Sequence, residues 1–449
     1  MFLKILVANR GEIALRIIRS AKLLGIKTVA VYSEPDKNSL HVMLADEKIC
    51  IGPSKSTDSY LNIPNVLSAA DITKADAIHP GYGFLAESPR FADICETHGI
   101  TFIGPPASIM KIMADKNNAR QEMKKARLPI IPGSDKILSN TEEAKKEAQK
   151  IGYPVILKAA AGGGGKGMRI VRTSGQLEGQ FAIAQGEAKA AFDNSDLYME
   201  KFIQGAHHIE IQVIADLKGN IMALTERECS IQRKYQKVLE ETPSPYIDEK
   251  LRKKMIKAVE EAARTIGYQS LGTFEFLVDD KKQFYFMEAN TRVQVEHPIT
   301  EFIYDIDLIK EQIKIAAGEK LSLKNDMKIS GHSIECRINA EDAETFIPSP
   351  GKIDFLTLPG GEGIRVDTAA YSGWEIPPFY DSLLAKIIAK GPNRKEAVDK
   401  IRTALEMTTV VGVKTNIPLH LAILSNNDFK KGNYDIQFLT KFLKSAGRR

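Results

Sequence analysis

The sequence contains no apolar run long enough to cross a membrane, because none approaches the roughly 18 residues that a spanning helix needs. It has only four cysteines among 449 residues, and they lie far apart without a C-x-x-C pair. This spacing indicates neither a zinc site nor a disulfide framework, so we expect a cytoplasmic protein. The 62 basic and 57 acidic residues give a net charge of only +5, without a long basic block. We therefore expect no nucleic-acid partner and no membrane partner.

The remaining composition is that of a globular protein, with 43% hydrophobic and 27% charged residues in a chain long enough for roughly three domains. Residues 4–33 predict a strand, a helix and a second strand, which form the βαβ unit of a parallel sheet. A later strand leads into the Gly-rich loop that contains Tyr82, where open α/β sheets gather ligands. Residues 248–266 predict an amphipathic helix, and short alternating strands predict a β-rich region from about residue 331. The predicted fold class is α/β, and α+β overall.

The stretch "KAAAGGGGKGMRIVR" (158–172) places a glycine-rich loop between two strand-like segments. Gly162, Gly164 and Gly167 satisfy G-x-G-x-x-G, which is a weak signal on its own. A P-loop is excluded because no Gly-Lys-Ser/Thr closes the run, and a Rossmann turn would open directly into a helix. We predict a hairpin whose backbone N–H groups cover phosphates, with Lys158 and Lys166 beside it. A flexible surface loop is the alternative.

The stretch "GTFEFLVDDKKQFYFMEANTR" (272–292) predicts an antiparallel hairpin, because two aromatic strands flank an Asp-Asp-Lys-Lys turn. Alternation then lets Glu275 oppose the strand that carries Glu288, with Asn290 two residues further along the same face. Carboxylate and amide oxygens are hard ligands that suit Mg²⁺ or Mn²⁺, and one or two ions are plausible. The alternative is a solvated hairpin edge.

The next segment, "TRVQVEH" (291–297), alternates with a period of two, which sends Arg292, Gln294 and Glu296 to one side. A cation, an amide and a carboxylate beside metal ligands indicate an oxyanion site with a base. Two other segments alternate in the same way. In "HHIEIQV" (207–213) and "HSIECRIN" (332–339) the polar faces carry His208, Glu210 and Gln212, and Ser333, Glu335, Arg337 and Asn339, respectively. A solvated edge strand is the alternative interpretation of the first of these two segments.

Together, "KAAAGGGGKGMRIV", the 272–298 segment, "HPGYGFLAES" and "ECRINAED" resemble the biotin carboxylase family of ATP-grasp enzymes. The resemblance extends from "ANRGEIALRI" to "GVKTNIPL", which is nearly the whole chain. It implies an N-terminal α/β domain at residues 1–113, an ATP-grasp domain at 114–330 with a mobile lid at about 131–203, and a β-rich C-terminal domain at 331–449. The glycine-rich hairpin would then be the lid over ATP.

The resemblance also implies a reaction and a role for matching residues. Bicarbonate would attack the γ-phosphate of ATP to give carboxyphosphate, and the released CO₂ would be captured by N1′ of a biotin on a carrier protein. The implied ATP-binding residues are Lys116, Lys158, Gly163, Gly164, Gly165, Glu200, Lys201, Phe202, Ile203, His208, Gln232, Tyr235, Leu277 and Ile436. The implied metal ligands are Glu275, Glu288 and Asn290, for two Mg²⁺ or Mn²⁺ ions. The implied bicarbonate ligands are Lys237, Arg292, Gln294 and Val295, with Glu296 as the base; Tyr82 and Arg337 would contact biotin, and Arg337 would stabilise its enolate.

Three positions depart from the pattern of many relatives. Tyr235 stands where a histidine often contacts the nucleotide, Lys166 replaces a frequent arginine in the lid, and Leu23 replaces an acidic residue that some relatives carry at a dimer interface. A homodimer is still expected. The "SIMKIMADK" string (108–116) looks like a core helix and not like a biotin attachment site, so a carrier protein and carboxyltransferase subunits are expected as separate chains.

The first hypothesis for the complete reaction is acetyl-CoA carboxylase, followed by a pyruvate or propionyl-CoA carboxylase. Two alternatives remain open at this point. One is another ATP-grasp ligase of the purine-pathway or carbamoyl-phosphate type, which would lack the Arg292, Gln294, Glu296 and Arg337 arrangement. The other is a regulatory or nucleic-acid-binding protein that binds ATP at a catalytically dead site.

Overall fold

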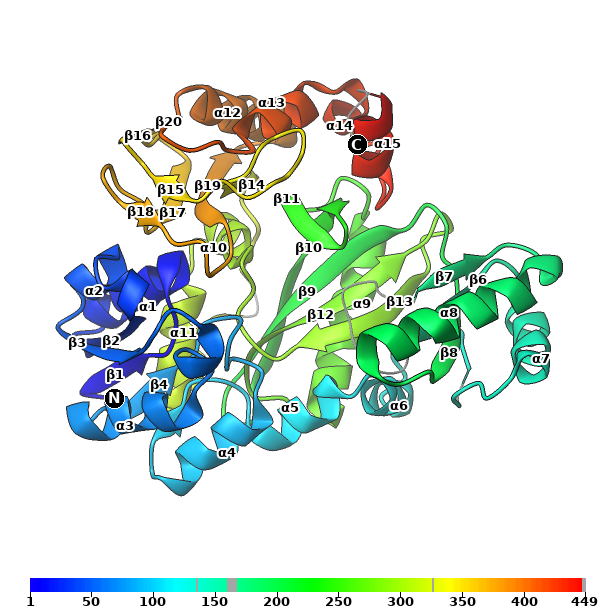
Figure 1. Ribbon diagram of the computed structural model, residues 1–449, viewed down its shortest axis with the longest axis horizontal. Coiled ribbons are helices and arrows are strands. Elements are labelled where there is room, and N and C mark those ends of the chain that lie inside the picture. Colours follow the sequence, from blue (N-terminus) through cyan, green and yellow to red (C-terminus); the bar gives the residue numbers. More distant parts are fainter. Residues whose placement is uncertain (135, 160–167, 325–326, 446–449) are drawn as a thin grey trace.

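A computed structural model describes residues 1–134, 136–159, 168–324 and 327–445 (Figure 1). Its N-terminal part is a five-stranded parallel sheet in the order β3-β2-β1-β4-β5. The apolar run of β1 is buried on both faces, as expected for a parallel strand covered by helices. The elements are β1 (Lys4–Val7), α1 (Gly11–Leu23), β2 (Lys27–Ser33), α2 (Leu40–Leu44), β3 (Glu47–Gly52), α3 (Ile63–Thr73), β4 (Ala77–His79), α4 (Pro89–Thr97) and β5 (Thr101–Phe102). The predicted βαβ unit is confirmed, and Tyr82 follows β4 in the loop where it was expected.

An eight-stranded antiparallel sheet forms the centre of the molecule, in the order β13-β12-β9-β10-β11-β14-β19-β17. Its strands are β9 (His207–Ala215), β10 (Ile221–Arg233), β11 (Gln236–Thr242), β12 (Ser270–Val278), β13 (Phe284–Asn290), β14 (His332–Asn339), β17 (Ile364–Thr368) and β19 (Leu383–Gly391). Helix α9 (Glu249–Thr265) packs its apolar stripe on β9 and β10, and Asp248 caps its N-terminus, so the predicted amphipathic helix is confirmed. The sheet continues across residue 331, and the three-domain division remains a prediction.

A smaller three-stranded sheet, β7-β6-β8, lies at the right of Figure 1. Strand β6 (Val155–Ala159) pairs antiparallel with β7 (Arg169–Val171), which confirms the glycine-rich hairpin. Strand β8 (Leu197–Lys201) pairs with the other side of β6, and helices α7 (Thr141–Ile151) and α8 (Leu177–Phe192) complete its core. The glycines at 162–165 and 167, with Lys166, lie outside the described residues.

The remaining elements connect and cover these sheets. They are α5 (Ala107–Ala114), α6 (Lys116–Lys125), α10 (His297–Tyr304), α11 (Leu308–Ala316), β15 (Gly351–Lys352), β16 (Phe355–Thr357), β18 (Glu375–Ile376), α12 (Arg394–Glu406), β20 (Thr409–Val411), α13 (Ile417–Ser425), α14 (Asn427–Lys431) and α15 (Phe438–Ser445). Single 3₁₀ turns occur at Glu34–Asp36, Ser56–Asp58 and Ser174–Gln176. Helix α5 buries Ile109, Met110 and Met113, so the "SIMKIMADK" segment is the predicted core helix. No helix in the described parts of the chain is long and apolar enough to cross a membrane.

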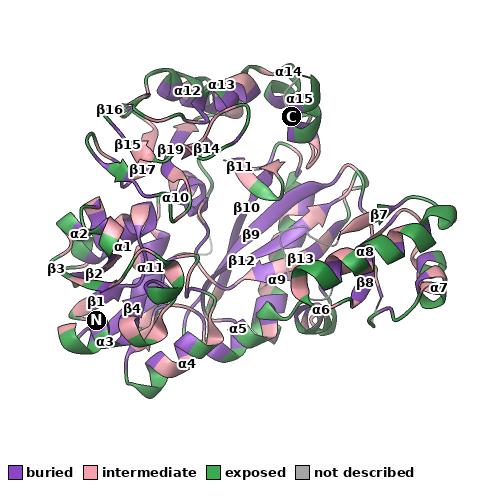
Figure 2. Ribbon diagram, in the orientation of Figure 1, coloured by how far each residue is buried: buried purple, intermediate pink, exposed green. Residues whose placement is uncertain are grey.

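Two interpretations of polar alternation are wrong. The 207–213 segment is not an edge strand, because β9 lies between β12 and β10 and all nine of its residues are buried (Figure 2). The 291–296 segment is not a strand, because the chain leaves β13 and turns into α10, where the His297 N–H donates to the Gln294 carbonyl at 3.3 Å. The polar side chains of both segments make ion pairs and hydrogen bonds in the interior, which a strand pattern alone does not reveal.

Candidate active site

One cavity of about 1570 Å³ is lined by the central sheet, the three-stranded sheet, the loop after β4 and the segment after β18. It brings together residues from nearly the whole sequence, from Asn9 to Thr440. Of the predicted site residues in the described parts of the chain, all line this cavity except Glu296, which lies directly behind its wall. The predicted lid residues Gly163, Gly164 and Gly165 lie outside the described residues.

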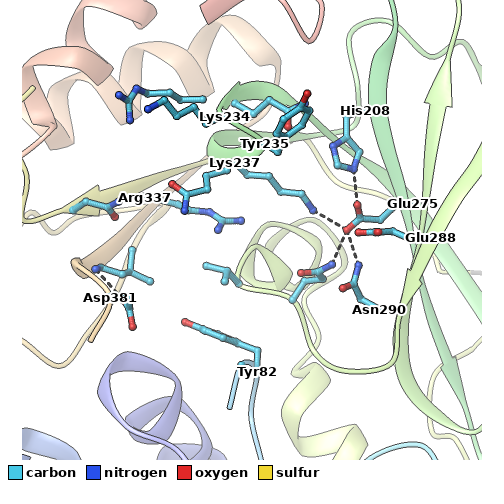
Figure 3. A pocket seen from close by; sticks show the side chains of 18 of the residues that line it. Tyr82, His208, Lys234, Tyr235, Lys237, Glu275, Glu288, Asn290, Arg337 and Asp381 are labelled. Atoms are coloured by element: carbon cyan, nitrogen blue, oxygen red, sulfur yellow. Dashed lines mark hydrogen bonds and ion pairs between the residues drawn. The ribbon is translucent and has the colours of Figure 1, made fainter. Parts of the chain in front are cut away.

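Glu275 and Glu288 are direct cross-strand partners in the β12-β13 hairpin, as the alternation predicted. A bulge follows Glu275, and such irregularities re-aim side chains next to functional sites. Glu275 accepts hydrogen bonds from Asn290 Nδ2 at 2.8 Å and from Lys237 Nζ at 3.1 Å, and its second oxygen lies 2.7 Å from His208 Nε2 (Figure 3). The two carboxylates are therefore adjacent as predicted, but the Asn290 amide turns its nitrogen toward Glu275, while its oxygen accepts from Arg292 Nη2 at 2.9 Å.

The two carboxylates differ in charge compensation. Burial raises the pKa of Glu275, but Lys237 and His208 outweigh burial and hold the pKa well below its usual range. Burial and the neighbouring Glu275 raise the pKa of Glu288, and within the described residues no side chain or backbone group donates a hydrogen bond to it. A divalent cation would compensate this charge, so the oxygen-rich donor set fits Mg²⁺ or Mn²⁺.

Glu296 is a buried carboxylate held between two cations. Its Oε1 lies 2.6 Å from Lys237 Nζ, and its Oε2 lies 2.9 Å from Arg337 Nη2. Burial raises the pKa of Glu296, but Lys237 and then Arg337 outweigh burial and keep the pKa well below the ordinary value. The group is therefore ionised and oriented, which a proton acceptor at the site requires.

Lys237 connects Glu296 to Glu275, one of the predicted metal ligands. Its ammonium lies 2.6 Å from Glu210, 3.1 Å from Glu275 and 2.6 Å from Glu296. Burial lowers the pKa of Lys237, but the three carboxylates raise it well above the ordinary value, so the lysine is a fixed cation. Glu210 also pairs with buried Arg227, which explains how the polar face of β9 is satisfied in the interior.

Arg292 is fixed by a contact that the sequence did not indicate. Its Nε donates to Glu87 at 2.8 Å, and its other nitrogens donate to Gln294 Oε1 at 2.8 Å and Asn290 Oδ1 at 2.9 Å. Glu87 also accepts from the backbone N–H of Thr291 at 3.0 Å. Glu87 lies 205 positions from Arg292, and its place before a helix cap gave no local signal of this role.

On the opposite side of the cavity, Glu200 on β8 pairs with both Lys158 and Arg120. Arg120 was not predicted, although it lines the same cavity and also donates to the Ile131 carbonyl at 2.9 Å. The ammonium of Lys201 donates to the carbonyls of residues 152 and 153, both at 2.9 Å. Lysines and a carboxylate in an otherwise apolar wall suit a nucleotide with its phosphates.

The turn between β10 and β11 places Lys234 and Tyr235 at φ values of +48° and +67°. Positive φ at two successive non-glycine residues is unusual and is found where surrounding structure imposes it. Tyr235 is 64% exposed and lines the cavity, as a nucleotide contact from this turn would require.

Arg337 and Tyr82 line the same cavity, and in Figure 3 Arg337 lies at the left, whereas Glu275 and Glu288 lie at the right. Arg337 Nε donates to buried Glu240 at 2.6 Å, and burial together with Glu296 raises the pKa of Glu240 to about 7 although Arg337 lowers it. The Tyr82 hydroxyl donates to buried Glu12 of α1. Both side chains are thus anchored from behind and present polar groups to the cavity.

The fold combines a parallel N-terminal sheet, a central antiparallel sheet that carries facing carboxylates, and a smaller sheet that contains the β6-β7 hairpin; this is the fold of an ATP-grasp ligase. The N-terminal residues 1–110 match the family model "Biotin carboxylase, N-terminal domain", and residues 335–441 match "Biotin carboxylase C-terminal domain". Between them, residues 115–324 match "Carbamoyl-phosphate synthase L chain, ATP binding domain". The chain belongs to the biotin carboxylase family.

Curated relatives and solved structures agree with this assignment. A biotin carboxylase of Haemophilus influenzae is 53% identical over 99% of both chains, and the chloroplastic biotin carboxylase of Arabidopsis thaliana is 52% identical over 98% of this chain and 82% of its own length. The biotin carboxylase–beta-gamma-ATP complex from Campylobacter jejuni superposes with a TM-score of 0.94 at 48% identity, over 98% of this chain and 99% of that chain. The biotin carboxylase domain dimer of the 2-oxoglutarate carboxylase of Hydrogenobacter thermophilus gives a TM-score of 0.92 at 49% identity, over 98% of each chain.

Proposed function

We propose that the chain carboxylates biotin on a carrier protein, with ATP and bicarbonate as co-substrates and carboxyphosphate as the intermediate. The observation that carries this proposal is the position of Glu296, a buried carboxylate clamped by Lys237 and Arg337 beside the Glu275–Glu288 pair. One relative was solved as a beta-gamma-ATP complex and another with MgADP, ADP and bicarbonate, and these are the kinds of ligand that this arrangement suits.

The nucleotide end of the cavity binds ATP. Lys158, Arg120 and Lys116 line this cavity, and their positive charges would offset the charge of the triphosphate. Ile203, Leu277 and Ile436 would supply the apolar contacts to the adenine ring of ATP. The family pattern also assigns ATP contacts to Glu200–Ile203, His208, Gln232 and Tyr235.

Glu275, Glu288 and Asn290 would hold one or two Mg²⁺ or Mn²⁺ ions. When bound, such ions would offset the negative charge that develops during phosphoryl transfer. Glu275 already satisfies its oxygens with four protein donors, so metal binding would exchange some of these contacts, whereas the Glu288 carboxylate accepts no hydrogen bond from the described residues.

Bicarbonate would bind to Arg292, Gln294, Lys237 and the backbone of Val295, and Glu296 would accept its proton. When bicarbonate binds beside Lys237 and Arg337, its negative charge offsets part of their positive charge. The pKa of Glu296 therefore rises, which makes this carboxylate a better proton acceptor for the bound bicarbonate. The anion then attacks the γ-phosphate. Arg337 would afterwards stabilise the negative charge on the ureido oxygen of biotin, while the released phosphate takes the N1′ proton.

For the complete reaction we infer acetyl-CoA carboxylase, in which a biotin carboxyl carrier protein and carboxyltransferase subunits are separate chains. A pyruvate carboxylase is the second candidate, because the biotin carboxylase subunit of a pyruvate carboxylase is 50% identical over 99% of both chains, with a TM-score of 0.88. We also infer a homodimer and, from the widely spaced cysteines, a cytoplasmic location.

The test is ATP hydrolysis by the purified chain with Mg²⁺, with and without bicarbonate and free biotin. We expect hydrolysis to depend on bicarbonate and to rise when biotin is added. Hydrolysis that ignores bicarbonate would favour another ATP-grasp ligase, and no hydrolysis with tight ATP binding would favour a dead regulatory site.

A further inference from the structure

Lys386 on β19 is a fully buried lysine to which the proposed chemistry gives no role, with 0% of its surface exposed. Its ammonium donates to the Val295 carbonyl at 3.0 Å and lies 3.0 Å from Glu12 Oε2. The next carboxylate, Asp367, is 3.9 Å away. Burying a charge lowers the stability of the folded state unless partners compensate it, so a buried lysine at this position suggests a functional role.

The partners of Lys386 come from separate parts of the chain. Glu12 belongs to α1 in the N-terminal part, and Val295 belongs to the segment between β13 and α10. The other oxygen of Glu12 accepts a hydrogen bond from the Tyr82 hydroxyl. The Lys386 ammonium therefore contacts both Val295 and Glu12, and these two residues line the cavity. Lys386 itself is not among the cavity-lining residues.

The sheet fixes where this ammonium can lie. On either side of Lys386, the residues in register are Arg337 on β14 and Asp367 on β17. Asp367 is engaged mainly by Arg365, whose Nη2 donates to it at 2.6 Å. The Lys386 ammonium therefore interacts mainly with the Val295 carbonyl and Glu12, on the strand next to the one that carries Arg337.

We propose that Lys386 is a positioning residue that holds the Val295 segment and the Glu12–Tyr82 pair from behind, and so fixes the bicarbonate-binding segment against the biotin end of the cavity. This inference rests on the proposed function of that segment. Loss of the ammonium should loosen the carbonyl of Val295 and its neighbours Gln294 and Glu296, whereas the nucleotide end of the cavity is built by other strands.

The test replaces the ammonium by an apolar group of similar length, in Lys386→Met. We expect the KM for bicarbonate to rise at least tenfold, which is the scale of one lost charge-assisted hydrogen bond, while the KM for ATP changes less than twofold. Lys390→Met is the matched control, because Lys390 lies on the same strand and its Nζ donates to the Phe302 carbonyl at 2.8 Å, away from the cavity lining. Its bicarbonate KM should stay within twofold of the wild type.

A second variant keeps the test valid if Lys386→Met fails to fold because Glu12 is left buried without a cation. In Glu12→Gln/Lys386→Met the uncompensated charge is gone and the amide oxygen can still accept the Tyr82 hydroxyl. We expect thermal stability to recover in this double variant while the bicarbonate KM remains at least tenfold above the wild type. A bicarbonate KM within twofold of the wild type in either folded variant, or ATP and bicarbonate KM values that rise together, would overturn the inference.

Failure of the proposed function would look different, because the wild-type chain itself would then lack bicarbonate-dependent hydrolysis. The Lys386 comparison is made against an active wild type and rests on the split between two KM values. A purely structural role would lower stability without this split.

Discussion

Arg337→Met should uncouple ATP hydrolysis from biotin carboxylation. Arg337 contributes two charge-assisted contacts, to Glu240 at 2.6 Å and to Glu296 at 2.9 Å, and its guanidinium lines the cavity. If it stabilises the enolate oxygen of biotin, its loss removes a transition-state contact of about 3 to 4 kcal/mol, or about 10²- to 10³-fold in rate. Methionine keeps most of the side-chain stem, so the packing loss is small.

The assay measures carboxybiotin formed and ATP hydrolysed in the same reaction. We expect the ratio of the two to fall sharply in Arg337→Met. Bicarbonate-dependent hydrolysis should be slower, because Arg337 also orients Glu296, but it should persist, because carboxyphosphate can form and decay without capture of CO₂. The KM for ATP should change little, since the nucleotide end of the cavity is formed by other residues.

A matched control separates this effect from the general loss of a buried ion pair. Arg252 on α9 donates twice to buried Glu226, at 2.7 and 2.8 Å, and does not line the cavity. Arg252→Met should lower thermal stability without changing the ratio. A wild-type ratio and wild-type carboxylation rate in folded Arg337→Met would refute the assignment and move the biotin site toward Tyr82.

Three further predictions follow from the same geometry. Glu288→Lys should abolish turnover without unfolding the chain, because a cation beside the metal site adds several kcal/mol of repulsion where about 1.4 kcal/mol is tenfold in rate. Replacing Gly164 and Gly165 by alanine should raise the KM for ATP, since each Cβ obstructs approach to phosphates. Burial raises the pKa of Glu241, but Arg394 and His332 lower it to about 2, so its stabilisation is present above its unfolded pKa and is lost as the pH falls from about 5 to about 2. Arg394→Met should therefore raise the midpoint pH of acid unfolding, with a stability loss at pH 7 on the order of 3 kcal/mol.

Each of these predictions has a measurement that can contradict it. Near-normal ATP hydrolysis in folded Glu288→Lys would remove the β12-β13 hairpin from the active site, and Glu288→Gln is its control for charge reversal. An unchanged KM for ATP in the alanine variant would return the glycine-rich loop to a surface role. Acid unfolding of Arg394→Met can be monitored by circular dichroism. A midpoint pH equal to that of the wild type would show that Arg394 does not set the pKa of Glu241.

Much of the fold could be predicted from the sequence, because local residue patterns determine several of its helices and strands. The β12-β13 hairpin was readable from two aromatic strands around a charged turn, and its register placed Glu275 opposite Glu288. Helix α9 followed from its apolar stripe and its Asp248 cap. These elements are set by interactions between neighbours in sequence, which periodicity reports directly.

The surroundings of the site were harder to predict. From the sequence, the polar face of β9 was compatible with either a functional site or a solvated edge, yet Glu210 and Gln212 are fully buried because Arg227 and Lys237 bind them. The contact of Glu87 with Arg292 joins residues 205 positions apart, and no periodicity encodes such a pair. The 291–296 segment alternates like a strand, but no neighbouring strand pairs with it in the described structure and the chain turns into α10.

The most direct test of the central claim is to follow radiolabelled bicarbonate into carboxybiotin with the purified chain, ATP, Mg²⁺ and free biotin. We expect labelled carboxybiotin only when ATP, a divalent cation and biotin are all present, and none from folded Glu296→Gln. Carboxybiotin formation at the wild-type rate by Glu296→Gln, or ATP hydrolysis by the wild type without any labelled carboxybiotin, would contradict this claim.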